Sequence, residues 1–234
     1  MFHGKMKAVT FSYDDGVTQD IRLIKLFDKY NLRCTFNINS QLAGKSGSLI
    51  RKGKKVDHNK INLSDIKEIY KGHEIAVHTL THPNLTLLKD EEIIWQVEED
   101  KKNLERASGK KIYGMAYPGG GINWNRHVAQ VIQAHTSIQY ARTTDITDGF
   151  GRQKNLFAFR PNAYHVMNME RLFSVGEKFL REEESEEKIL YIWGHSYEFD
   201  IADTWNEFER FLELISGHEN IFYGTNREVL LDWR

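Results

Sequence analysis

Short apolar runs alternate with segments of helical periodicity along most of this chain, and that alternation limits the folds open to it. The clearest helix is expected at residues 89–109, where Ile93, Val97 and Leu104 lie on one apolar stripe and Gly109 supplies a C-terminal stop. Further helices are expected at 21–30, 63–70, 169–183 and 205–215. Strands are expected at 7–13, 33–39, 73–79, 112–118, 137–143, 156–162, 188–195 and 220–225.

Strands that alternate with helices predict an α/β protein with a mostly parallel sheet, which is either a closed barrel or an open doubly wound sheet. The length of 234 residues predicts a single domain that spans 1–234. In both architectures the catalytic groups lie at the C-terminal ends of the strands. The residues that follow each expected strand are therefore the place to look for a site.

The charge balance and the cysteine count exclude several classes of partner. The chain has 32 Lys and Arg against 33 Asp and Glu, so it lacks the positive surplus of a nucleic-acid-binding protein. No stretch approaches the roughly 20 apolar residues that span a bilayer, and the N-terminus has no export signal. Cys34 is the only cysteine, which is typical of a reducing compartment. We therefore expect a cytoplasmic protein without a nucleic-acid or membrane partner, and its oligomeric state is left open.

Residues 43–60 break the alternation with glycines and lysines and are predicted to form an exposed loop. The basic run in this segment could contact an acidic ligand. A solvated surface face is the favoured interpretation, because most charge runs are of that kind.

Carboxylates, imidazoles and glycines follow several of the expected strands, and parallel strands would bring them to one face of the sheet. They are Asp14 and Asp15 in "FSYDDG", His78 and His82 in "HTLTHP", the glycines of "AYPGGG", and His195 in "GHS". An ordinary Asp-Gly turn would explain the first of these motifs equally well.

His78 and His82 are four residues apart, and in a helical turn this spacing places both imidazoles on one face. Two imidazoles and one carboxylate suit zinc, cobalt, nickel or iron. Such a set leaves coordination positions open for water and substrate, as a hydrolytic metal site requires. Hydrogen-bonded turn histidines are the alternative.

The four motifs occur in the order found in the polysaccharide deacetylases with the NodB-homology domain, also called carbohydrate esterase family 4, and the chain resembles that family. "FSYDDG" is similar to the first family motif, "HTLTHP" to the second, "AYPGGG" to the third and "GHS" to the final histidine motif. The resemblance implies a distorted (β/α) barrel of about seven strands. It also implies one divalent cation as cofactor, with zinc first and cobalt, nickel or iron as alternatives, bound by Asp15, His78 and His82.

The resemblance implies further roles at the site. Asp14 becomes the general base that takes a proton from water beside the cation, and His195 becomes the general acid that protonates the leaving amine. The backbone N–H of Gly119 is expected to stabilise the tetrahedral oxyanion.

Two departures from the family pattern concern the groups that orient the catalytic residues. The third motif usually begins with Arg, which orients the base, whereas this chain has Ala116. Arg142, at the end of the next expected strand, is our substitute, with Arg160 second. The fourth-motif aspartate that holds the catalytic histidine has no clear counterpart, although Asp145 and Asp148 lie in the region.

These features predict metal-dependent removal of an acetyl group from an N-acetylated sugar or oligosaccharide. An amidase or imidase that acts on a small non-carbohydrate amide is the alternative among hydrolases. A carbohydrate-binding relative without catalysis is the alternative from another class, and the presence of all five Asp and His residues argues against it.

Overall fold

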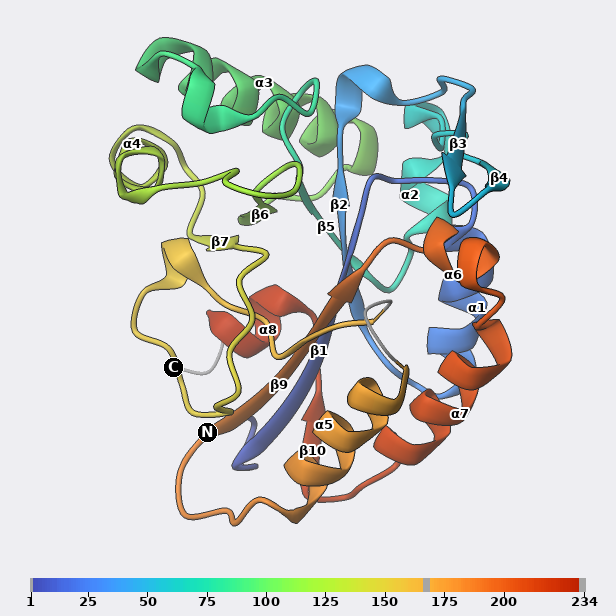
Figure 1. Cartoon of the computed structure of the whole chain (residues 1–234). Coiled ribbons are helices and arrows are strands. Elements are labelled where there is room, and N and C mark those ends of the chain that lie inside the picture. The colour runs from blue at the N-terminus through green and yellow to red at the C-terminus, as the bar shows by residue number, and fades with distance from the viewer. Residues whose placement is uncertain (1, 166–168, 232–234) are drawn as a thin grey trace.

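The computed structural model describes residues 2–165 and 169–231, which form one curled parallel sheet with most of its helices outside it (Figure 1). The sheet contains β1 (Lys7–Asp14), β2 (Cys34–Ile38), β5 (Glu74–Val77), β6 (Gly114–Ala116), β7 (Tyr140–Arg142), β8 (Ala163–Tyr164), β9 (Lys188–Gly194) and β10 (Ile221–Tyr223). Seven strands follow the order β7-β6-β5-β2-β1-β9-β8, and β10 pairs with the first residues of β1.

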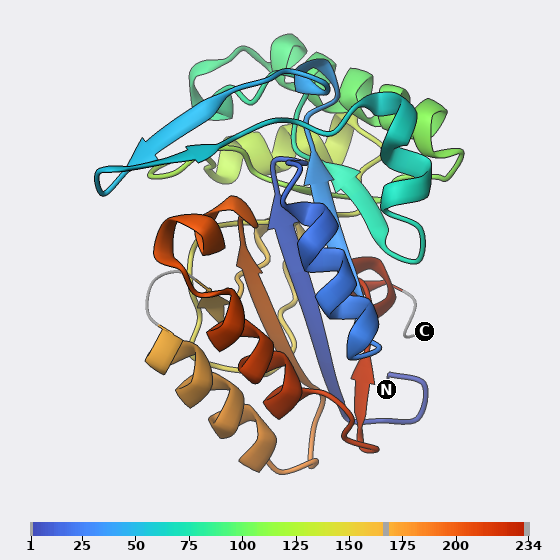
Figure 2. The same cartoon turned by 90° about the vertical axis from the view of Figure 1, so that its right-hand side faces the viewer.

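Most helices cover the outer face of the sheet, and every residue of the interior strand β1 is buried. The long helices are α1 (Asp20–Lys29), α3 (Asp90–Ser108), α4 (Arg126–His135), α5 (Met169–Arg181) and α7 (Trp205–Ile215). The short ones are α2 (Ile66–Ile69), α6 (Tyr197–Ala202) and α8 (Asn226–Leu230), with single 3-10 turns at Ser40–Leu42, Leu63–Asp65, Leu85–Leu87 and Leu156–Ala158. On this face α5, α7 and α1 pack in sequence beside one another, and α3 packs against α4 farther along the curled sheet (Figure 2).

The distorted barrel predicted from the sequence is confirmed, with seven strands in a path whose two ends, β7 and β8, do not pair with each other among the described residues. A single parallel β-bridge between Arg142 and Phe159 lies at the β7 end of this path, where the barrel is open. The assignment of residues 1–234 to a single domain stays a prediction. Among the described residues, no helix combines the length and apolar character needed to cross a membrane. The cytoplasmic location also stays a prediction.

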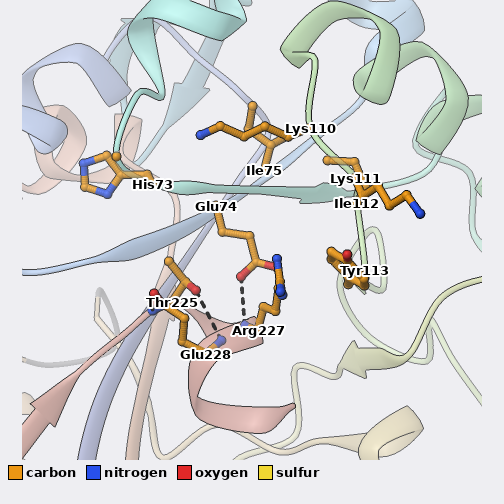
Figure 3. Close-up of a pocket in the computed structure, with 11 residues that line it drawn as sticks. His73, Glu74, Ile75, Lys110, Lys111, Ile112, Tyr113, Thr225, Arg227 and Glu228 are labelled. Atoms are coloured by element: carbon orange, nitrogen blue, oxygen red, sulfur yellow. Dashed lines mark hydrogen bonds between the residues drawn. The ribbon is translucent and has the colours of Figure 1, made fainter. Parts of the chain in front are cut away.

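A cavity of about 630 Å³ lies where β5 and β6 begin, lined by residues that include His73, Glu74, Tyr113 and Arg227 (Figure 3). Glu74 accepts hydrogen bonds there from the hydroxyls of Thr35 (2.7 Å) and Tyr140 (2.9 Å) and from the Arg227 amide (2.9 Å). These donors occupy both oxygens of a carboxyl whose pKa is raised by burial. The cavity is at the strand starts, away from the end where parallel barrels carry out catalysis.

Two predicted segments differ from the structure. Residues 43–60 are not an irregular loop, because β3 (Ser48–Arg51) and β4 (Lys54–Asp57) form an antiparallel hairpin. Lys52 and Gly53 both have positive φ, as a tight two-residue hairpin turn requires. The strand predicted at 156–162 is a 3-10 turn followed by a bend, and the actual strand β8 begins after Pro161, which has no N–H to donate to a ladder.

Candidate active site

The first part of the site is a buried ion pair that joins the ends of β1 and β7. Asp14 is the last residue of β1, and the guanidinium of Arg142, at the end of β7, donates to its Oδ2. Asn37 donates to Asp14 Oδ1 at 2.8 Å, so the two carboxylate oxygens have different partners. The Arg142 guanidinium also lies 4.4 Å from the centroid of the Trp193 ring. Arg142 therefore contacts Asp14 as expected, but the guanidinium donates to the carboxylate through one nitrogen, Nη2, rather than through two.

Asp15 follows β1 in a left-handed turn, with a φ of 85°, and Gly16 continues the turn with a φ of 59°. The Asp15 amide donates to the Asn37 carbonyl (2.9 Å). Asp15 Oδ2 lies 3.2 Å from His58 Nε2, and Oδ1 lies 3.3 Å from Lys60 Nζ. Burial would raise the pKa of Asp15, but these two neighbours outweigh it and hold the pKa well below its usual value. The group is therefore a carboxylate.

His78 and His82 lie in a loop after β5, not in the helical turn in which a four-residue spacing would place both rings on one face. Thr79 and His82 have φ values of 66° and 62°, and this left-handed backbone brings the two rings to a centroid separation of 4.9 Å. The four-residue spacing thus places the imidazoles together through a strained loop rather than through helical periodicity.

Asp15, His78 and His82 form a cluster, here called the candidate triad, in which one ligand atom from each residue lies within 4.8 Å of the others. His78 Nδ1 lies 2.9 Å from the Ala116 carbonyl, so this nitrogen carries the proton and Nε2 has the free lone pair. Nε2 is buried and has no hydrogen-bond partner among the described residues. Burial lowers the pKa of His78 to about 4 and also lowers that of His82. Two neutral imidazoles and a carboxylate are the donor set that a zinc-like cation prefers.

A buried carboxylate that the sequence reading missed fixes the loop that carries His78. Asp100 of α3 accepts from the backbone amides of Ser40 (2.6 Å) and His78 (3.1 Å). It thereby joins the segments that follow β2 and β5.

His195 follows β9 and is paired with Glu198, which is the second residue of α6. Glu198 Oε2 lies 3.1 Å from His195 Nδ1 and accepts from the His195 amide at 3.1 Å. Burial works against the charged imidazole, but Glu198 and the nearby aspartates outweigh it and raise the pKa of His195 to about 9. The hydroxyl of Tyr164 donates to the other Glu198 oxygen. Glu198 therefore takes the position for which the sequence offered no aspartate.

Gly119 lies in the loop after β6 with a φ of 82°. The side-chain amide of Asn123 donates to the carbonyls of Tyr117, Pro118 and Gly119 at 3.3, 3.1 and 2.7 Å, which fixes the course of this loop. No contact between Gly119 and the candidate triad is seen among the described residues. Its part in binding an oxyanion stays a prediction.

The other residues weighed for orienting roles lie elsewhere. Arg160 is exposed and donates to the Ile146 carbonyl, so it is not a partner of Asp14. Asp145 accepts from the Trp124 indole (3.0 Å), and Asp148 lies 3.4 Å from Arg171. None of these three side chains contacts His195.

The fold and this cluster together define a distorted parallel barrel protein whose acidic, basic and imidazole side chains meet at the C-terminal mouth of the barrel. The family model for polysaccharide deacetylases matches residues 3–139, which is 137 of the 234 residues. The chain therefore belongs to the polysaccharide deacetylase family of hydrolases, the NodB-homology group also known as carbohydrate esterase family 4.

Solved structures of this family share the fold at low sequence identity. The Xyl-CE4 domain of a multidomain xylanase from the hindgut metagenome of Trinervitermes trinervoides superposes with a TM-score of 0.62 at 14% identity, covering 97% of this chain and 90% of that one. A family 4 carbohydrate esterase from Streptomyces lividans, in complex with acetate, gives 0.58 at 13% identity, with coverages of 94% and 92%. A pseudoenzyme of the family from Bacillus anthracis gives 0.55 at 14% identity, with coverages of 96% and 66%. No curated protein matches the sequence.

Proposed function

We propose that this protein is a divalent-metal-dependent deacetylase that removes the acetyl group from an N-acetylated sugar or oligosaccharide. The observation that supports this most directly is the meeting of three functional groupings at one barrel mouth. They are the candidate triad, the pair of Asp14 with Arg142 and the pair of His195 with Glu198. Together they supply a cation site, a base and an acid, which are the parts that amide hydrolysis needs.

Asp15, His78 and His82 would hold the cation, with zinc preferred and cobalt, nickel or iron as alternatives. The unpartnered Nε2 of His78 supports this assignment, because a buried ring nitrogen without a partner is costly unless it binds something. The bound cation would polarise the acyl carbonyl and lower the pKa of water nearby.

Asp14 would accept the proton of the attacking water at its carboxylate, while Arg142 and Asn37 keep both of its oxygens in place. His195 would donate a proton from its ring to the leaving amine, because its raised pKa keeps it charged at neutral pH. The amide N–H of Gly119 would stabilise charge on the former carbonyl oxygen.

A direct experiment is to load the protein with zinc and screen three substrate classes: acetylated oligosaccharides, sugar O-acetyl esters and small cyclic amides. We expect acetate release from an acetylated sugar, and loss of that release on chelation. Turnover of the cyclic amides alone would instead establish the imidase alternative. The cavity beside the candidate triad, about 390 Å³, gives that alternative some support, because this volume suits a single small ligand.

A further inference from the structure

We propose that the substrate carries an anionic group, a carboxylate or a phosphate, that binds between the β3–β4 hairpin and the candidate triad. This inference rests on the proposed deacetylase function of the same site. It assigns a role to the basic segment 43–60, which the mechanism above does not use.

The cavity of about 390 Å³ beside the triad has a basic wall. Lys45, His58 and Lys60 line it from the hairpin side, and Asp15 and His82 line it from the triad side. Asp15 is the only acidic residue that lines this cavity in the described part of the chain. An anion that enters would therefore meet two ammonium groups and one carboxylate that already has partners.

Backbone hydrogen bonds hold the base of the hairpin against the loop that carries Asp15. Ile61 donates to the Gly16 carbonyl (2.9 Å), and Lys60 donates to the Lys45 carbonyl (2.9 Å), so the two lysines are fixed side by side. The Lys60 side chain is only 7% exposed, and its ammonium also donates to the Asp15 carbonyl at 2.9 Å. Figure 2 shows the hairpin projecting from the end of the molecule toward which β1 and β2 run. The basic wall is thus a fixed part of the barrel mouth.

The other cations of the hairpin face a different group of residues. Lys54 donates to the Asp200 carbonyl, and Lys54 and Lys55 line a separate surface hollow together with Asp200 and Asp203. Acidic side chains are available to balance these charges. Lys45 differs from them because it lines the cavity next to the triad, and no ion pair between Lys45 and a carboxylate is seen among the described residues.

The charges around the site favour an anionic ligand. Asp14 is paired with Arg142, Asp15 with Lys60, and Glu198 with His195, so these six groups sum to zero before any cation binds. A divalent cation held by the triad would leave the mouth with a surplus of two positive charges. Transfer of the water proton to Asp14 stays within the site and leaves this surplus unchanged, so an anionic group on the substrate would offset part of it.

The test compares three probes on zinc-loaded protein: N-acetylglucosamine, its 6-phosphate, and N-acetylmuramic acid, which is the same sugar with a carboxylate-bearing substituent. Acetate release gives kcat/KM, and calorimetry gives Kd for each probe. The variant Lys45→Gln removes one charge from the cavity without touching Asp15. Lys55→Gln removes the same charge from the other face of the hairpin and is the matched control.

We expect an anionic probe to be preferred over the neutral sugar by at least tenfold, and we expect Lys45→Gln to reduce that preference by about five- to tenfold, as for loss of one charge a few ångströms from the ligand. Lys55→Gln should leave the preference unchanged, and high salt should weaken it in the wild type. Which anionic probe is preferred separates the carboxylate from the phosphate. Equal kcat/KM and Kd for all three probes, or a preference that Lys45→Gln does not alter, would overturn the inference while leaving deacetylation intact.

If none of the probes releases acetate, deacetylation of these sugars fails, and the calorimetry still decides the inference. Tighter binding of an anionic probe that depends on Lys45 supports it, and equal binding refutes it.

Discussion

Replacing Glu198 by Gln tests the proposed acid directly, because it keeps the shape of the partner of His195 and removes its charge. The wild-type pKa of His195 is raised from 6.5 to about 9, and Glu198 is the largest contributor to that rise. Without the carboxylate, burial is opposed only by the more distant Asp15 and Asp14, so we expect the pKa of His195 to fall toward its ordinary value of 6.5.

The size of the effect on activity follows from the protonated fraction of His195. At pH 8 that fraction is about 0.9 for a pKa of 9 and about 0.03 for a pKa of 6.5, so kcat/KM should fall about 30-fold in the variant. At pH 6 or below most of this loss should be recovered. The assay is the pH profile of kcat/KM, together with a titration of His195 by nuclear magnetic resonance in the cation-free protein.

The same shift affects stability. Because the folded pKa lies above the unfolded value, the pair stabilises the fold fully below about pH 6.5, and this contribution disappears as the pH rises through 9. At pH 7 it amounts to about 2–3 kcal/mol, to be measured as the difference in unfolding free energy between wild type and variant. Glu213→Gln, the same change on the exposed face of α7, is the control. An alkaline limb at the same pH in wild type and Glu198→Gln would refute the assignment of His195 as the acid.

The remaining predictions concern the cation and the base. Single alanine substitutions of the triad should remove the bound zinc and, with it, the activity. Zinc content is measured by elemental analysis, and unchanged content in all three variants would rule out Asp15, His78 and His82 as the ligand set. Asp14→Asn should keep the zinc and lose hydrolysis, because the amide cannot accept the proton. If Asp14→Asn instead lost the zinc while Asp15→Asn retained it, Asp14 would be the metal ligand and Asp15 the base. Arg142→Met should keep the zinc and lower kcat by on the order of a hundredfold, as for a mispositioned base, and wild-type kinetics would show that Asn37 alone orients Asp14. Unfolding should be followed in parallel, since truncating one partner of a buried ion pair commonly costs about 3–5 kcal/mol.

Features with strong local signals were predictable from the sequence. The helix predicted at 89–109 is α3, and Gly109 ends it with a φ of 70°. The helix predicted at 205–215 is α7 with the same bounds. In each case an apolar stripe buried against the sheet agrees with local helix preference, so local and tertiary contributions act together.

Elements that depend on a turn or on tertiary contacts were harder to predict. The hairpin of β3 and β4 has a polar sequence with little alternation, and its Lys52-Gly53 turn lacks the Asn or Asp that usually signals such a turn. Helix α4 has ten residues and was not predicted, although Asn125 caps it by accepting from the Val128 amide at 2.9 Å. That cap was the signal available for finding it.

The candidate site divides in a similar way. Strand direction alone brings to one mouth the residues at or just after strand ends, so five could be selected: Asp14, Asp15, His78, His82 and His195. Glu198 could have been found from its position three residues after His195, since that spacing joins side chains across one turn. His58 and Lys60 could not, because only the folded hairpin places them against Asp15.

The left-handed backbone at Asp15, Thr79 and His82 creates a conflict between the function of these side chains and the thermal stability of the protein. A residue with a side chain at positive φ costs on the order of 1 kcal/mol, which glycine would avoid. A library of variants sorted only by survival of heating should therefore accumulate glycine at these positions, two of which belong to the candidate triad. Laboratory evolution for thermostability alone would then produce variants that no longer bind the cation or catalyse the reaction, unless each round also selects for bound metal.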